Sequence, residues 1–164
     1  MLEIQKYPKP VLRKRCEELK EITEETLKLA EEMKKKMITT EGIGLAGNQI
    51  GVEKRIIVVQ TEKGPEVFFN PRILKISKEN EFSDEGCLSL PNMYLKIRRA
   101  KEVLVEAQDI DKKIVQIEAR DLPARIFQHE IDHINGKLII NRIGFWERLK
   151  IRKLLHGIAT KTRS

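Results

Sequence analysis

The sequence predicts an α+β fold, in which helices and strands occupy separate parts of the chain. A helical pattern lies between residues 23 and 39, a series of short strand-like runs follows to about residue 118, and helical patterns return after residue 121. Alternating strands and helices would instead indicate a parallel α/β sheet. We therefore expect N-terminal helices, antiparallel strands, a second long helix and a C-terminal helix.

Two helices are expected near the N-terminus. Pro10 is a favourable first residue for a short helix over residues 11–19. Thr23 is suited to cap a longer helix over residues 24–39. The apolar stripe of this second helix is spaced for one helical face and is interpreted as a core face: Leu27, Ala30, Met33 and Met37.

Short runs of β-branched and aromatic residues predict the strands. They cover residues 56–59, 67–69, 73–76, 94–98, 102–107 and 114–118. Asn70-Pro71 is expected to end the second of these strands. The last two runs flank Asp109-Ile110-Asp111 and therefore predict a hairpin.

The C-terminal third predicts two helices with a strand between them. The first should begin at Asp121 or Leu122 and end at Asn135-Gly136. Residues 137–140 are apolar and are expected to add a strand. Residues 145–158 predict an amphipathic helix, with these apolar side chains available for packing: Trp146, Leu149, Leu154 and Ile158.

Length and composition suit one soluble domain spanning residues 1–164. No apolar stretch approaches the roughly 18 residues of a membrane span, and residues 1–6 lack a basic-then-apolar leader. The two cysteines, Cys16 and Cys87, do not suggest a secreted disulfide framework, so we expect a reduced, cytoplasmic setting. The net charge of +7 permits a polyanionic partner such as RNA, but a solvated surface is preferred for most of the chain.

A metal-site motif lies in the second long helix, where His129 and His133 are four residues apart and Glu130 follows the first of them. This spacing puts both imidazoles on one helical face, within reach of one metal ion. Glu130 is then placed to take a proton from water. The motif therefore predicts metal-assisted hydrolysis of an amide-like bond.

A hydrolytic site of this kind needs a third protein ligand. Ile139 stands where metzincins continue with a histidine, and Glu147 is the only acidic residue after the motif. Cys87, between glycine and small or apolar residues, is the better candidate. Cys16 is instead interpreted as a small buried residue, and His156 as a surface charge in the basic tail.

Three segments resemble the three signatures of bacterial peptide deformylases, in the same order and with similar spacing. They are Gly42-Ile43-Gly44-Leu45-Ala46-Gly47-Asn48-Gln49, Glu85-Gly86-Cys87-Leu88-Ser89, and Gln128 to Gly136, which contains His129-Glu130-Ile131-Asp132-His133. The segments beginning at Tyr7 and Asn70 are similar to family positions too, so the resemblance covers nearly the whole chain. It implies removal of the N-formyl group from the initiator methionine of nascent polypeptides, with release of formate.

The resemblance also implies the roles of individual residues and a fold with antiparallel sheet packed around the motif helix. Cys87, His129 and His133 become the ligands of one divalent metal ion, typically Fe²⁺ in the cell, with Zn²⁺, Ni²⁺ or Co²⁺ able to replace it. Glu130 becomes the general acid/base, and the Gln49 side chain and the backbone N–H of Leu88 stabilise the oxyanion. The residues expected at the bound peptide are Ile43, Gly44, Glu85 and Gly86.

The chain departs from the family pattern at two places. Gly47-Asn48 replaces the Ala-Pro of many members, which is expected to loosen the loop bearing Gln49. Tyr94 stands where some members have an arginine that holds the peptide backbone. Substrate positioning is therefore less well defined by the sequence than catalysis.

The sequence leaves two other hypotheses open. A metallopeptidase with the same helix motif would cleave unformylated peptides internally. An RNA- or ribosome-binding module is suggested by the basic tail: Arg142, Arg148, Lys150, Arg152, Lys153, Lys161 and Arg163. The resemblance makes ribosome contact through this C-terminal helix an added property rather than a rival, and no membrane partner is expected.

Overall fold

The computed structural model describes residues 2–163, and side chains as far as residue 160. Its helices are α1 (Glu24–Thr39), α2 (Asp121–Ile134), α3 (Phe145–Lys150) and α4 (Arg152–Arg163), with 3₁₀ turns η1 (Pro10–Arg13), η2 (Gly47–Ile50) and η3 (Ile139–Asn141). Its strands are β1 (Gly44–Ala46), β2 (Ile56–Thr61), β3 (Gly64–Ile76), β4 (Asn80–Cys87), β5 (Leu90–Ala100), β6 (Glu102–Gln108) and β7 (Ile114–Arg120). The predicted α+β class is confirmed.

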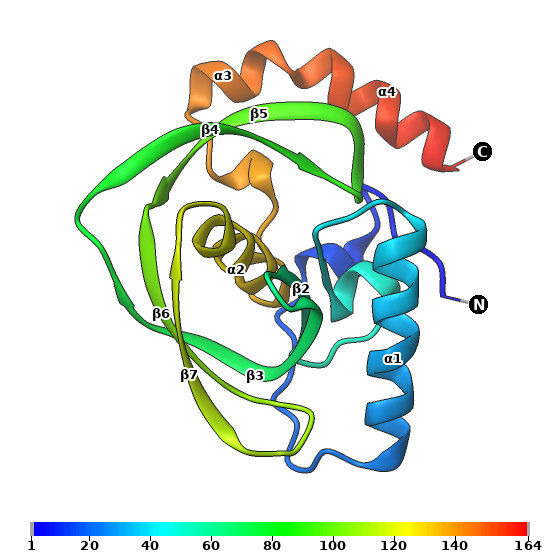
Figure 1. Ribbon diagram of the computed structural model, residues 1–164. Helices are drawn as coiled ribbons and strands as arrows, with labels where there is room; N and C mark the ends of the chain where they lie inside the picture. Colours follow the sequence, from blue (N-terminus) through cyan, green and yellow to red (C-terminus); the bar gives the residue numbers. More distant parts are fainter. Residues whose placement is uncertain (1, 164) are drawn as a thin grey trace.

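The strands form two antiparallel sheets around α2. One sheet has five strands in the order β1-β2-β3-β6-β7, and the other consists of β4 and β5. Figure 1 looks close to the axis of α2, which lies near the centre, with β4 and β5 on one side and β3, β6 and β7 on another. Helices α3 and α4 lie outside β4 and β5, and α1 lies on the outer side of the large sheet.

Strand β2 explains why two helices pack on one sheet. Its residues alternate between faces, and both faces are buried. Ile56 and Val58 join the apolar cluster that contains α1 residues, whereas Ile57 and Val59 join the cluster that contains α2 residues. The uninterrupted β-branched run is therefore required, because each side chain contributes about 1.5–3 kcal/mol by burial.

The best-predicted elements are those with local signals at their ends. Helix α1 has the expected bounds, and the Thr23 hydroxyl accepts a hydrogen bond from the Thr26 N–H. Helix α2 begins at Asp121, and Gly136 follows its end with a φ of 74°, the left-handed conformation that glycine adopts without strain. The β6–β7 hairpin is also confirmed.

The helix predicted over residues 11–19 is wrong beyond its first turn, since only η1 forms. The chain then runs extended beside other segments. The Cys16 N–H donates to the Ile134 carbonyl at 2.8 Å, and Arg15 and Glu17 form isolated bridges with Asn135 and Lys54. Tertiary pairing of the backbone therefore outweighs local helix propensity here.

The strands differ from the prediction in two places. Asn70-Pro71 does not end a strand, because β3 continues through it with register shifts, and Asn70 has a φ of 51°. Such irregularities accommodate a proline, which cannot donate to the ladder. Strand β4 was missed altogether, since its polar sequence pairs with β5 but has little apolar patterning.

The C-terminal region also differs. Residues 137–140 form no strand and lead instead into η3, and the helix predicted over 145–158 is two helices separated at Ile151. Ile158 packs into a core cluster with β5 residues, but Trp146, Leu149 and Leu154 remain largely exposed. Within residues 2–163, no helix has the length and apolar character needed to cross a membrane.

Candidate active site

Helix α2 positions the two histidines of the motif. His129 and His133 lie one turn apart, with their Nε2 atoms 3.2 Å from each other and ring centroids 4.9 Å apart. Most of the helix is buried, so these rings are held between the two sheets. The predicted one-face arrangement of the imidazoles is confirmed.

Cys87 approaches the histidines from the other sheet. It is the last residue of β4, and a register shift between Gly86 and Cys87 makes it pair with Leu90. Such a bulge redirects a side chain, and the Cys87 Sγ lies 3.2 Å from His133 Nε2. Cys16, by contrast, is buried in the core cluster as expected.

The three side chains fit a single metal ion. One ligand atom from each of Cys87, His129 and His133 lies within 4.8 Å of the others. A tetrahedral ion with bonds of about 2.0–2.3 Å would hold its ligand atoms roughly 3.5 Å apart, close to the 3.2 Å separations at His133. One thiolate and two imidazoles leave a fourth position available to water or substrate.

Glu130 is buried beside this cluster, with a relative exposure of 3%. Among the described residues, none makes a hydrogen bond to its Oε2. Burial, which penalises the charged carboxylate, raises the pKa of Glu130 to about 7. Gly44 makes room for this side chain, because a Cβ there would lie 2.2 Å from Glu130 Oε1.

Gln49 faces the cluster with a fixed amide. Its Oε1 accepts a hydrogen bond from the Ala46 N–H at 2.8 Å. Its Nε2 is therefore turned towards Cys87 Sγ, at 3.7 Å, and Ser89 Oγ, at 3.3 Å. A donor in this orientation is suited to a developing negative charge at the cluster.

The loop bearing Gln49 is not loosened in the way expected from Gly47-Asn48. Asn48 is fully buried, and its Nδ2 donates to the His133 carbonyl. Gly47 is needed for close packing, because a Cβ there would lie 2.5 Å from the Lys54 carbonyl oxygen. Both replacements therefore fit a tightly packed loop.

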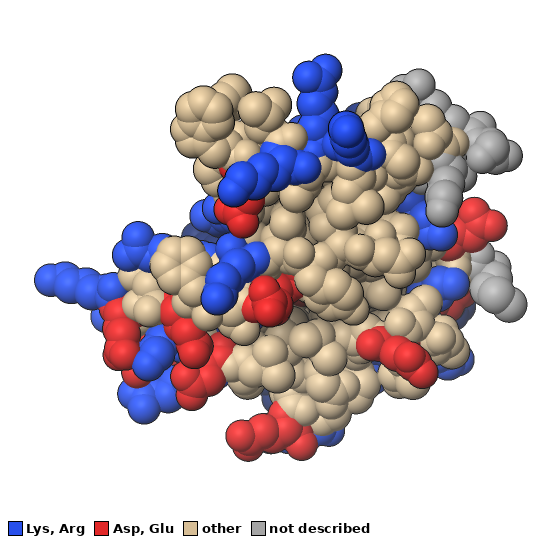
Figure 2. Space-filling model, turned by 90° about the horizontal axis from the view of Figure 1, so that it is seen from above, with Lys and Arg blue, Asp and Glu red and all other residues tan. Residues whose placement is uncertain are grey.

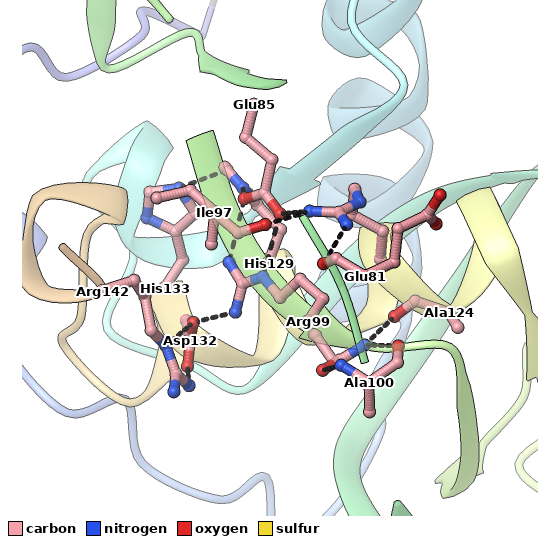
Figure 3. Close-up of polar contacts among 12 residues, drawn as sticks. Glu81, Glu85, Ile97, Arg99, Ala100, Ala124, His129, Asp132, His133 and Arg142 are labelled. Carbon is pink, nitrogen blue, oxygen red and sulfur yellow. Dashed lines mark hydrogen bonds and ion pairs between the residues drawn. The ribbon is translucent and has the colours of Figure 1, made fainter. Parts of the chain in front are cut away.

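Glu85 orients His129 rather than facing solvent. Its Oε2 lies 3.0 Å from His129 Nδ1, so the Nε2 atom of that ring is left to face the cluster. Arg99 binds both Glu85 oxygens, at 2.9 and 3.0 Å (Figure 3). Arg125 adds a third contact, at 2.7 Å from Glu85 Oε1. Burial alone would raise the pKa of Glu85, but the hydrogen bonds from His129 and Arg99 outweigh it and hold the pKa well below its usual range.

A pocket of about 440 Å³ opens beside the cluster. Leu88 and Glu130 line this pocket. So does every residue that was expected to contact the peptide: Ile43, Gly44, Glu85 and Gly86. Ile43 and Tyr94 are exposed at the pocket. The Tyr94 ring covers Gly86, where a Cβ would lie 2.9 Å from its Cε1.

Several residues that support the site were not predicted from the sequence: Asn48, Ser89, Arg99, Arg125 and Arg142. One signal was available for Arg99. It lies at an inward-facing position of β5, two residues after the buried Ile97, where a charged residue needs partners. The partners of the others are distant in sequence and leave no such pattern.

A buried helix with two converging histidines, a strand cysteine, a buried glutamate and an adjoining pocket together define a metal-dependent hydrolase. Residues 1–148 match the family model described as polypeptide deformylase. The chain therefore belongs to the polypeptide deformylase family, whose members are metal-dependent enzymes that remove the N-formyl group from nascent peptides.

Individual relatives agree with this family. The chain is 40% identical over 163 residues to the peptide deformylase of Thermotoga neapolitana, covering 99% of each chain. It is similar to the crystal structure of peptide deformylase from Thermotoga maritima, with a TM-score of 0.85 and 40% identity over 88% of this chain and 98% of that one. It also resembles the Ehrlichia chaffeensis enzyme in complex with actinonin, with a TM-score of 0.92 and 32% identity over 99% and 98%.

Proposed function

We propose that this chain deformylates N-formylmethionyl peptides in the pocket beside Cys87, His129 and His133, with residues 1–164 acting as one catalytic domain. The observation that most supports this is the convergence of those three ligand atoms next to the buried Glu130. When bound there, a divalent ion would polarise the formyl carbonyl and lower the pKa of water.

Glu130 is proposed to move the proton. A carboxyl with a pKa of about 7 can accept a proton from water and then deliver it to the leaving amine. Its Oε2 accepts no hydrogen bond from the residues that the structure describes, which leaves one oxygen available for this exchange. The enclosed position of the side chain keeps bulk water from competing for the proton.

Two donors are proposed to stabilise the negative oxygen that forms as the formyl carbon becomes tetrahedral. One is the Gln49 amide, which the Ala46 N–H holds in orientation. The other is the backbone N–H of Leu88, which follows the ligand Cys87 and lines the pocket. The extended peptide is proposed to lie against Ile43, Gly44, Glu85 and Gly86.

The direct test is formate release from formyl-Met-Ala-Ser by protein loaded with Fe²⁺ without air. Formate should appear, and actinonin should inhibit its release. No formate with Fe²⁺, Ni²⁺ or Co²⁺ would overturn the proposal. The metallopeptidase alternative instead predicts internal cleavage of unformylated peptides. It also predicts that a Cys87→Ser variant keeps most of its metal.

We propose Fe²⁺ as the ion in the cell. One thiolate and two imidazoles suit iron and zinc alike, so the donor set supports either ion and the proposal for iron follows the family resemblance. Metal analysis of protein purified anaerobically should find about one iron per chain. Stoichiometric zinc with full activity would contradict it.

We also propose that the enzyme works in the cytoplasm, in contact with the ribosome through α3 and α4. In Figure 2, which looks onto this face, Lys and Arg side chains project beside uncharged ones. Arg152 and Lys153 are exposed there. Their reversal to Glu should weaken co-sedimentation with ribosomes, whereas reversal of Lys28 and Lys35 on α1 should not; equal binding by all forms would refute the contact.

A further inference from the structure

A row of charged side chains, buried from Glu85 to Asp132 and ending at the partly exposed Arg142, connects the ligand His129 to the segment that precedes the C-terminal helices. Glu85 binds His129, and Arg99 binds Glu85 with two nitrogens. The remaining nitrogen of Arg99 lies 2.5 Å from Asp132 Oδ2. Arg142 then holds Asp132 from the other side, as Figure 3 shows.

Arg142 binds both oxygens of one carboxylate. Its Nε donates to Asp132 Oδ2 at 2.8 Å, and its NH2 group donates to Oδ1. Two-pronged contacts of this kind fix orientation as well as charge. Arg142 follows directly after η3, so this contact joins the segment leading to α3 to the buried face of α2.

Each carboxylate in the row is shared by two arginines. Asp132 is 6% exposed and is shared by Arg99 and Arg142, whereas Glu85 is shared by Arg99 and Arg125. A buried carboxylate that loses one of its two partners is left with uncompensated negative charge, which strengthens its attraction for the partner that remains. If Arg142 were removed, Asp132 would therefore compete with Glu85 for Arg99, and Glu85 would hold the His129 ring less firmly.

We propose that Arg142 is a positioning residue, which keeps His129 aimed at the metal by satisfying Asp132 and so leaving Arg99 to hold Glu85. This deepens the proposed function, since it rests on His129 being a metal ligand. Loss of a direct partner of a ligand typically lowers metal affinity by about 10- to 100-fold. Arg142 acts on Glu85, the direct partner of His129, only through Asp132 and Arg99. We therefore expect a smaller loss of metal affinity, of about 3- to 10-fold.

The test compares Arg142→Ala with a matched control, Arg72→Ala. Arg72 also makes a close pair with one carboxylate, that of Glu106, but on the outer surface of β3 and β6. Metal loss to excess chelator is followed for each protein, together with the absorption bands of the Co²⁺ form. Arg142→Ala should lose metal about 3- to 10-fold faster and show altered bands, whereas Arg72→Ala should match the wild type.

Two further variants separate positioning from general destabilisation. Arg142→Lys keeps the charge but not the two-pronged contact, so its rate of metal loss should be intermediate. Asp132→Asn in the Arg142→Ala background removes the competition for Arg99 and should bring metal loss back to within about twofold of the wild-type rate. A merely structural role for Arg142 would not give this rescue.

The outcomes distinguish the two proposals. Wild-type protein that binds no metal would overturn the proposed function and this inference together. If the wild type binds metal and is active, but the Arg142→Ala and Arg72→Ala variants lose metal at equal rates, only the role of Arg142 is overturned. Metal loss from the double variant as fast as from Arg142→Ala alone would also refute the competition through Asp132.

Discussion

Gly44 should be among the least replaceable residues of the site, because Glu130 occupies the space of a missing side chain. In a Gly44→Ala variant, the new Cβ would lie 2.2 Å from Glu130 Oε1, 2.8 Å from Cδ and 2.9 Å from Cγ. Non-bonded atoms settle at about 3.5 Å, so the carboxylate would have to retreat by about 1 Å. Glu130 is almost fully buried, so this retreat would take its carboxylate out of the position that it holds beside the three ligand atoms.

The expected cost follows from that displacement. A misplacement of about 1 Å at a catalytic group typically lowers the rate by about 10²-fold. We therefore expect kcat/KM for formyl-Met-Ala-Ser to fall by about 100-fold, chiefly through kcat. The metal content should not change, since the three atoms nearest to the new Cβ all belong to Glu130 and none to Cys87, His129 or His133.

The assay is formate release, measured alongside metal content and thermal unfolding. Gly144→Ala is the matched control, since a Cβ there meets nothing within 4 Å and its φ is −70°. This control should keep full activity. A Gly44→Ala enzyme that keeps its metal and more than a third of wild-type kcat/KM would refute the argument from close contact.

Three other substitutions should have measurable effects. Glu130→Gln should keep the metal but lower kcat by about 10²–10⁴-fold, and unchanged turnover would remove Glu130 from proton transfer. Gln49→Leu should lower kcat by about 10²–10³-fold with KM little changed, as steady-state kinetics would show. Burial raises the pKa of Cys16 from 9.0 to about 11, so the folded state holds that proton more tightly and its contribution to stability is full below pH 9 and lost as the pH rises to 11. At about 1.4 kcal/mol for each tenfold change in proton affinity, the loss at pH 11, where the folded thiol is only half ionised, is about 2 kcal/mol. Denaturant unfolding at pH 8 and pH 11 should show this loss in wild type and not in Cys16→Ala, and equal losses in the two proteins would contradict it.

The sequence was most informative where chemistry depends on local spacing. His129 and His133 are one turn apart in any helix, so their shared face could be predicted. Cys87 could be named as the third ligand candidate, but its direction depends on a bulge at the end of β4. That strand has a largely polar sequence and offered no pattern from which to predict it.

The charged side chains that support the site were harder to predict from the sequence, because their partners are far away in the chain. Arg99 and Glu85 are 14 residues apart, and Asp132 is 33 residues from Arg99. Residue types alone do not indicate which carboxylate pairs with which guanidinium. The same limit explains the error over residues 11–19, where backbone pairing with Ile134 and Glu53 replaces the expected helix.

The central place of α2 has a consequence for how the chain is made. The inner face of the large sheet packs on apolar side chains of that helix, among them Phe127, Ile131 and Ile134. During synthesis from the N-terminus, strands β1 to β7 are all translated before these residues are. The sheet therefore cannot complete its interior until the last quarter of the chain has been translated, and stalling before residue 134 should leave a species that binds hydrophobic dyes.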